Sequence, residues 1–153
     1  MNSVKIVHTG DMHLGSPVLN MGGKCRERSA ELNETFANII SLVKSENADI
    51  LLIAGDLFDS PEPDAELMDF VANQLCRIPD TSVFIVFGNH DFGVKMSFPP
   101  NVYIFGKSLE RVSLESVDVY GISFGTEHCF EPLAKNFKAV DSNRVNIMLM
   151  HGD

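Results

Sequence analysis

Four short polar clusters carry the residue types that bind divalent metal ions. They are Gly10–Gly15 (GDMHLG), Gly55–Asp59 (GDLFD), Gly88–Asp91 (GNHD) and His151–Asp153 (HGD). Aspartate, asparagine and histidine supply the oxygen and nitrogen atoms that divalent first-row metals select. Each cluster alone also fits an ordinary turn, because Gly, Asn and Asp are common turn residues. Four such clusters in one chain together predict a metal centre.

Each cluster follows a short apolar segment that is predicted to be a β-strand. The four segments are Val4–His8, Ile50–Ala54, Val83–Phe87 and Val145–Met150. The continuously apolar Ile50–Ala54 is typical of a strand that is covered on both faces. Sites in open α/β sheets form beyond the carboxyl ends of the strands. We therefore expect the polar clusters to converge at one edge of the sheet.

Two helices are predicted between the first three strands. Apolar residues recur every three or four positions over residues 32–43, which predicts a helix that begins between Lys24 and Ser29 and ends near residue 47. A second helix is predicted after Asp64, its expected N-cap. The alternation of strand and helix predicts parallel strands that are joined by helical crossovers.

The second half of the chain is predicted to form hairpins. Three short strands, Val102–Phe105, Arg111–Leu114 and Val117–Phe124, are separated by short polar segments. The last strand, Val145–Met150, is predicted to be buried. The elements together predict one α/β domain over residues 1–153, with mixed β-sheets and flanking helices.

The composition restricts how this chain can meet a phosphate ester. Of the 153 residues, 44% are hydrophobic and 22% are charged, which excludes a disordered chain. No apolar run reaches the roughly 18–20 residues that a transmembrane helix needs. The net charge of −9 argues against bulk electrostatic binding of nucleic acid. The positive charge that binds a phosphate must therefore come from a local group of residues or from a bound metal ion.

The cysteines and the N-terminus bear on the location of the protein. The three cysteines lie far apart and form no C-x-x-C pair, which is typical of reduced cysteines in a cytosolic protein. The chain begins almost directly with an apolar strand, without the basic segment and cleavage site of a signal peptide. We therefore expect a cytoplasmic location.

The four clusters, in their order along the chain, resemble those of the calcineurin-like metallophosphoesterases. That order is D-x-H, G-D-x-x-D, G-N-H-D and a strand-terminal histidine. The resemblance implies a β-sandwich core with βαβ units and hydrolysis of phosphate esters with two metal ions. Within the family, Asp11–Gly15 and Gly55–Asp59 are most similar to the SbcD-type DNA repair exonucleases. Protein Ser/Thr phosphatases would carry Arg-Gly in place of Ser60-Pro61, and Glu in place of Asp91.

The resemblance implies five metal ligands: Asp11, His13, Asp56, Asn89 and His151. Asp11 and His13 would hold the first ion, whereas Asn89 and His151 would hold the second. Asp56 would bridge both ions, since a carboxylate has two oxygens and a negative charge to offset two cations. Manganese is the family's usual metal, and nothing in the sequence separates it from iron, cobalt or zinc.

Two further residues receive catalytic roles from the resemblance. In the family, the histidine at the position of His90 assists the leaving group or stabilises the phosphoryl oxygens. Asp59 matches the carboxylate that orients and charges this histidine. The family's nucleophile is a metal-bound hydroxide, which forms near neutral pH because cations lower the pKa of water.

The family also carries a Gly-His-x-His motif some tens of residues beyond the position of His151, and each ion takes one histidine from it. The 153 residues contain no such motif. We therefore expect them to be a truncated, N-terminal portion of the domain, with weak metal binding and little activity. The strand Val145–Met150 or its neighbours are expected to lack partner strands and to favour self-association.

Three functions stay open on the sequence alone. The first is a DNA repair exonuclease that acts on DNA ends, for which the family implies a coiled-coil ATPase partner of the SbcC type and a homodimer. The second is a phosphodiesterase or phosphatase for small molecules, which an acidic surface tolerates better. The third is a catalytically inactive fragment with a partial metal site.

Overall fold

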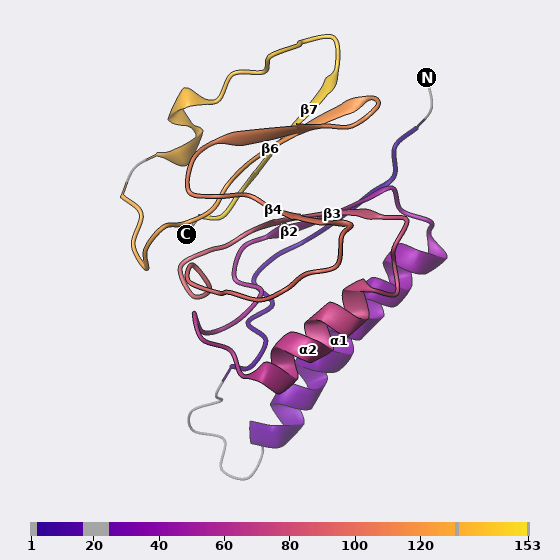
Figure 1. The fold of residues 1–153 in the computed structure, drawn as a ribbon, viewed down its shortest axis with the longest axis vertical. Helices are drawn as coiled ribbons and strands as arrows, with labels where there is room; N and C mark the ends of the chain where they lie inside the picture. The colour runs from indigo at the N-terminus through magenta and orange to yellow at the C-terminus, as the bar shows by residue number, and fades with distance from the viewer. Residues whose placement is uncertain (1–2, 17–24, 131, 153) are drawn as a thin grey trace.

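The computed structural model describes residues 3–16, 25–130 and 132–152. It has three layers, with a four-stranded sheet in the middle (Figure 1). A pair of helices covers one face of this sheet, and a three-stranded sheet lies over the other face. The predicted fold class, mixed α/β with helices flanking the sheets, is confirmed.

All strands of the four-stranded sheet are parallel. In spatial order they are β1 (Ile6–Thr9), β2 (Ile50–Ala54), β3 (Ser82–Val86) and β4 (Val102–Ile104). Helix α1 (Cys25–Ser45) joins β1 to β2, and helix α2 (Ala65–Leu75) joins β2 to β3. The predicted crossovers are therefore confirmed.

The three-stranded sheet is mixed. Its central strand, β6 (Val117–Ile122), pairs antiparallel with β5 (Glu110–Ser113) and parallel with β7 (Val145–Met150). A short 3₁₀ helix, η2 (Leu133–Asn136), lies in the connection between β6 and β7.

Strand β2 contributes to two hydrophobic cores. Leu51 and Ile53 belong to the core beneath the helices. Ile50 and Leu52 belong to the core between the two sheets. Successive side chains of a strand point to opposite faces, so a sheet that is covered on both faces requires a continuously apolar strand.

Both helices begin where the sequence predicts. The first begins within its predicted range; Lys24, at the start of that range, lies outside the described residues. In α2, the Asp64 carboxylate accepts a hydrogen bond of 2.8 Å from the main-chain N–H of Leu67. This N-cap satisfies one of the free donors of the first turn and fixes the start of the helix. In the described ranges, none of the helices is both long and apolar enough to cross a lipid bilayer.

The prediction of a hairpin at Val102–Phe105 is wrong, because β4 lies parallel to β3. The connection after β3 returns to the sheet edge at which β3 begins. There the side-chain amide of Asn101 donates hydrogen bonds of 2.9 Å to the carbonyls of Ile78 and Thr81. Strand β4 therefore starts beside the start of β3 and runs in the same direction. The hairpin between β5 and β6 is confirmed.

Val145–Met150 is a strand with the predicted bounds, but the prediction that it is buried is wrong. Only Leu149 is buried in β7, and Val145 is exposed. Strand β7 is only partly buried because it pairs with β6 on one side and lies at the edge of its sheet. Strand β2 has the predicted bounds, and most other predicted strand ends differ from the observed ones by one or two residues. Ser82, for example, pairs through its main chain at the start of β3 although it is polar.

Candidate metal centre

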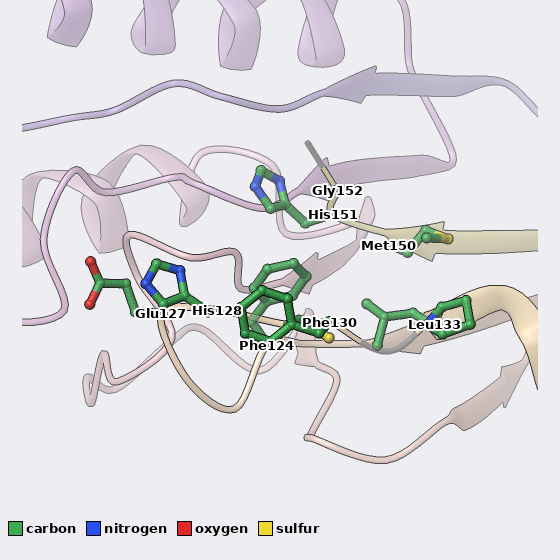
Figure 2. Close-up of a pocket in the computed structure, with 10 residues that line it drawn as sticks. Phe124, Glu127, His128, Phe130, Leu133, Met150, His151 and Gly152 are labelled. Carbon is green, nitrogen blue, oxygen red and sulfur yellow. The ribbon is translucent and has the colours of Figure 1, made fainter.

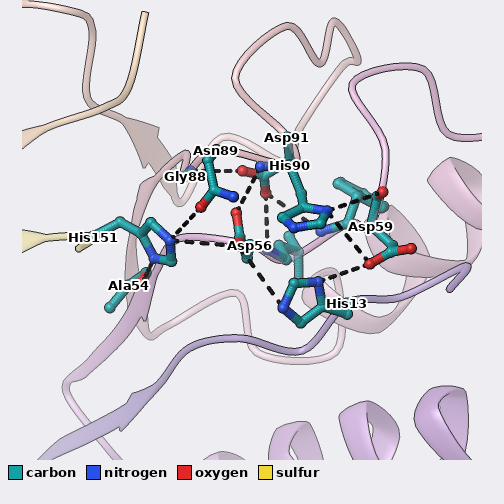
Figure 3. Close-up of polar contacts among 11 residues, drawn as sticks. His13, Ala54, Asp56, Asp59, Gly88, Asn89, His90, Asp91 and His151 are labelled. Carbon is teal, nitrogen blue, oxygen red and sulfur yellow. Dashed lines mark hydrogen bonds and ion pairs between the residues drawn. The ribbon is translucent and has the colours of Figure 1, made fainter. Parts of the chain in front are cut away.

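The polar clusters meet at the edge of the fold where β1, β2, β3 and β7 end (Figure 3). The ligand atoms of Asp11, Asp56 and His151 all lie within 4.8 Å of one another. The ligand atoms of His13, Asp59 and His90 form a second such group. This grouping differs from the division implied by the resemblance, which assigns Asp11 and His13 to the same ion. Asp153, the last residue of the fourth cluster, lies outside the described residues.

Three of the predicted ligands have left-handed backbone conformations. The φ angles of Asp11, His13 and Asp56 are 53°, 47° and 49°. Such conformations cost about 1–3 kcal/mol for a non-glycine residue and concentrate at functional sites. They persist here because the loop after β1 and the loop after β2 continue the pairing of these two strands. The Asp11 N–H donates to the Gly55 carbonyl (3.1 Å), and the His13 N–H donates to the Asp56 carbonyl (2.9 Å).

Two glycines allow the loops to approach each other closely. A Cβ atom on Gly55 would lie 2.4 Å from Nδ1 of His151, and one on Gly88 would lie 2.3 Å from Oδ1 of Asp56. Gly55 also has a φ of 83°, which favours glycine. No larger residue fits at either position while His151 stands beside Asp56.

The Asp56 carboxylate lies at the centre of the cluster and is 4% exposed. Its Oδ1 accepts a hydrogen bond of 3.0 Å from the main-chain N–H of His90. Its Oδ2 lies 3.4 Å from Nε2 of His151 and 3.8 Å from Nε2 of His13. One carboxylate therefore faces an imidazole on each side.

The orientation of His151 fits a metal ligand. Its Nδ1–H donates to the Ala54 carbonyl (3.0 Å), so Nε2 carries the lone pair of the neutral ring. Nε2 lies 3.0 Å from Oδ1 of Asn89, which is also an acceptor, and it faces Asp56 as well. Lone pairs that converge in this way, without a proton between them, fit a cation. The donor set, carboxylate, amide oxygen and imidazole, suits a divalent first-row metal.

Asp59 connects the remaining two histidines. Its Oδ1 lies 2.9 Å from Nδ1 of His13 and 3.5 Å from Nδ1 of His90. The two rings contact each other edge to face, with centroids 4.7 Å apart. The His90 side chain is 42% exposed, more than that of His13 at 32%.

Asp91 supports the site, a role that was not predicted from the sequence. Its side chain is fully buried, and its carboxylate accepts main-chain hydrogen bonds from Leu57 (2.8 Å), Phe58 (3.3 Å) and Gly88 (2.7 Å). Burial raises the pKa of Asp91, against the lowering effect of these hydrogen bonds, and the charge of Asp56 adds to the rise. Asp91 joins the loop after β2 to the loop after β3. The aspartate at the end of the Gly-Asn-His-Asp motif was the sequence feature that could have indicated this role.

A cavity of about 320 Å³ lies beside His151 (Figure 2). Its lining combines apolar side chains, among them Phe124 and Leu133, with polar ones such as Glu127 and His128. The Phe124 ring contacts the His151 ring edge to face, with centroids 5.4 Å apart. The cavity therefore borders the candidate metal centre through His151.

Residues 4–153 match the calcineurin-like phosphoesterase family, and the chain belongs to this family. It is 27% identical over 168 residues to the uncharacterized metallophosphoesterase YhaO of Bacillus subtilis, an alignment that covers 99% of this chain and 41% of the relative. It is 28% identical over 180 residues to the SbcD subunit of the nuclease SbcCD of Staphylococcus saprophyticus, an alignment that covers 97% of this chain and 46% of the relative. It is 32% identical over 90 residues to the DNA double-strand break repair protein Mre11 of Methanopyrus kandleri, an alignment that covers 58% of this chain and 19% of the relative.

The family resemblance drawn from the sequence is thereby confirmed, including its similarity to SbcD-type nucleases. The chain spans less than half the length of these curated relatives. Calcineurin-like phosphoesterases bind two divalent metal ions, and the side chains described above offer ligand atoms for them. The roles of the individual ligands and of His90 and Asp59 stay predictions.

Proposed function

We propose that residues 1–153 belong to a single metallophosphoesterase domain that hydrolyses phosphodiesters with two divalent metal ions. The observation that carries this proposal is the Asp56 carboxylate between the Nε2 atoms of His13 and His151, at 3.8 and 3.4 Å. This placement suits a carboxylate that bridges two cations. Asp11 and Asn89 would complete the ligands that this part of the chain supplies. The bound ions would neutralise charge on the phosphate and lower the pKa of a water nucleophile.

His90 is the residue proposed to act on the substrate. Its main-chain N–H is fixed by Asp56 (3.0 Å), whereas its ring is 42% exposed. The ring can therefore reach a phosphate beside the metal ligands. We assign it to hydrogen-bonding a phosphoryl oxygen or protonating the leaving oxygen. Asp59, whose carboxylate lies 3.5 Å from Nδ1 of His90, lies beside that ring.

DNA is the substrate that the relatives favour, and manganese is the proposed metal. One relative is named as part of a nuclease and another as a double-strand break repair protein. On this basis we propose a DNA repair exonuclease that acts on DNA ends, pairs with a coiled-coil ATPase of the SbcC type and works as a homodimer. The net charge of −9 means that DNA contact would depend on the bound cations.

A phosphodiesterase for small molecules is the second candidate. The cavity of about 320 Å³ beside His151 is large enough for a small organic group, and its lining offers both apolar and polar side chains to one. The acidic charge of the chain favours the same candidate, because a small ester, unlike DNA, needs no extended basic surface.

The test is hydrolysis by the complete protein, prepared metal-free and then supplied with Mn²⁺, Fe²⁺, Co²⁺ or Zn²⁺. The substrates are single-stranded DNA, blunt duplex DNA and the small diester bis(p-nitrophenyl) phosphate. Metal-dependent shortening of DNA from its ends is the expected result. Hydrolysis of the small diester alone would favour the second candidate. No hydrolysis of any substrate with any of the four metals would contradict both.

A further inference from the structure

Asp59 lies between two histidines but contacts them unequally. Its Oδ1 is 2.9 Å from Nδ1 of His13, a normal length for a charge-assisted hydrogen bond. The distance from the same oxygen to Nδ1 of His90 is 3.5 Å, beyond the usual range for such a bond. The better-formed hydrogen bond of Asp59 is therefore with a proposed metal ligand, not with the proposed catalytic histidine.

The main chain fixes Asp59 beside His13. The Leu14 N–H donates to the Leu57 carbonyl (3.0 Å), and the Asp59 N–H donates to the Leu14 carbonyl (3.0 Å). Leu14 and Phe58 form a parallel β-bridge between these bonds. The residue that follows His13 is thus hydrogen-bonded to the segment that carries Asp59. Their side chains meet because the two loops are paired.

His90 reaches Asp59 from a different loop and with weaker contacts. Its Nδ1 lies 3.4 Å from the main-chain carbonyl of Asp59, in addition to the 3.5 Å contact with the carboxylate. Its side chain is 42% exposed, whereas that of Asp59 is 19% exposed. The loop pairing that fixes Asp59 beside His13 does not include His90.

We infer that Asp59 is a positioning residue for His13, an inference that rests on the proposed function. Because the carboxylate accepts from Nδ1–H, the neutral His13 ring has its lone pair on Nε2, the nitrogen that lies 3.8 Å from Asp56 Oδ2. A histidine that binds metal through one nitrogen commonly donates its other N–H to such a carboxylate, which fixes the tautomer and the ring orientation. Asp59 thereby prepares His13 for metal binding and leaves the His90 ring free to meet the substrate.

The first test compares Mn²⁺ binding by metal-free Asp59→Ala, Asp59→Asn and His90→Ala in the complete protein, by titration calorimetry. Asp59→Ala is expected to weaken the affinity for Mn²⁺ by about 10–100-fold. Asp59→Asn is expected to keep most of the affinity, because its amide oxygen can still accept from Nδ1–H of His13. His90→Ala is the control and is expected to bind Mn²⁺ like the wild type. Wild-type affinity in Asp59→Ala would overturn the inference.

The second test needs neither metal nor substrate. Long-range ¹H–¹⁵N NMR spectra of the metal-free wild type are expected to show His13 protonated at Nδ1. In Asp59→Ala this preference should be lost, and in Asp59→Asn it should be kept. A His13 that is protonated at Nε2 in the wild type would overturn the role inferred for Asp59 but not the proposed function. Absence of Mn²⁺ binding by the wild type would instead overturn the proposed function, so the two failures can be told apart.

Discussion

Two buried aspartates of this domain have opposite electrostatic surroundings. Asp118, in β6, has no exposed side-chain surface and pairs with two guanidinium groups, those of Arg144 (3.1 Å) and Arg111 (3.7 Å). Asp56, at the candidate metal centre, is 4% exposed. Among the described residues, its ion-pair partners are the imidazoles of His13 and His151, which carry charge only when protonated.

The difference separates a carboxylate whose charge the protein compensates from one that we propose to bind a cation. Burial alone would raise the pKa of Asp118, but hydrogen bonds from Ser113 and Arg144 and the charges of Arg144 and Arg111 hold it below its usual value. The protein itself therefore compensates the charge of Asp118. A buried carboxylate without such partners is costly. Asp56 accepts one main-chain hydrogen bond, from His90, and its carboxylate also lies near that of Asp11. An external cation would resolve this cost.

The largest expected effect is that of Asp56→Ala on metal content and hydrolysis. Both should fall to background together in the complete protein, because the proposed bridging oxygens are removed. Metal analysis and a phosphodiester assay on the same sample measure this. Asp118→Ala is the control, and its folded fraction should keep the metal. Metal retention by Asp56→Ala, or equal loss in both variants, would remove the distinction between the two aspartates.

His90→Ala should reduce hydrolysis without removing metal. General acid assistance contributes about 10²–10⁴ in rate, so we expect a fall of that order in kcat. The same metal analysis and assay apply, with Asp56→Ala measured in parallel. If both variants lost metal equally, the separate roles assigned to His90 and Asp56 would be wrong.

The sequence predicted the elements that position the site better than the contacts within it. Ile50–Ala54 was predicted in full, because a strand buried on both faces must be apolar throughout. The convergence of the loops after β1, β2 and β3 followed from the rule that loops after parallel strands share one edge of a sheet. The sequence did not predict that His151 reaches Asp56 from the other sheet, whose strand β7 contacts β2. The direction of β4 was missed, because its partner is chosen by a long-range connection that Asn101 anchors.

The types and spacing of the residues do not predict the finer geometry of the candidate metal centre. The left-handed φ of Asp11, His13 and Asp56 depends on hydrogen bonds between two loops that are more than 40 residues apart. The preference of Asp59 for His13 over His90 is a difference between 2.9 and 3.5 Å, which only coordinates reveal. Motif order therefore predicted which residues meet, but not which ones pair.

Asp91→Ala should have a smaller effect, on stability. Three buried main-chain donors, those of Leu57, Phe58 and Gly88, would lose their acceptor. Leaving buried donors unpaired costs roughly 1–3 kcal/mol each, so the free energy of unfolding should fall by about 3 kcal/mol or more. Urea denaturation measures it. Asp64→Ala, which removes a single N-cap bond, should cost only about 1 kcal/mol. Equal losses would show that Asp91 does not join the two loops.

The smallest effect is the pH dependence that Asp118 contributes. Its folded-state pKa lies below the ordinary value of 3.8, so the folded state binds this proton more weakly than the unfolded state does. The stabilisation is therefore fully present above that pH and is lost as the pH falls through the folded-state pKa. Urea denaturation at a series of pH values on either side of 3.8 should show the wild type approaching Asp118→Asn in stability as the pH falls. A stability difference that does not shrink below pH 3.8 would contradict this.

The most direct test of a cation site at Asp56 is calorimetric titration of Mn²⁺ into the metal-free complete protein, as wild type, Asp56→Asn and Asp118→Asn. Asp56→Asn keeps the shape of the side chain, removes its charge and replaces one acceptor oxygen with a donor NH₂ group. We predict that the wild type and Asp118→Asn bind Mn²⁺ alike and that Asp56→Asn binds it far more weakly. Unchanged binding by Asp56→Asn, or no binding by the wild type, would contradict the account.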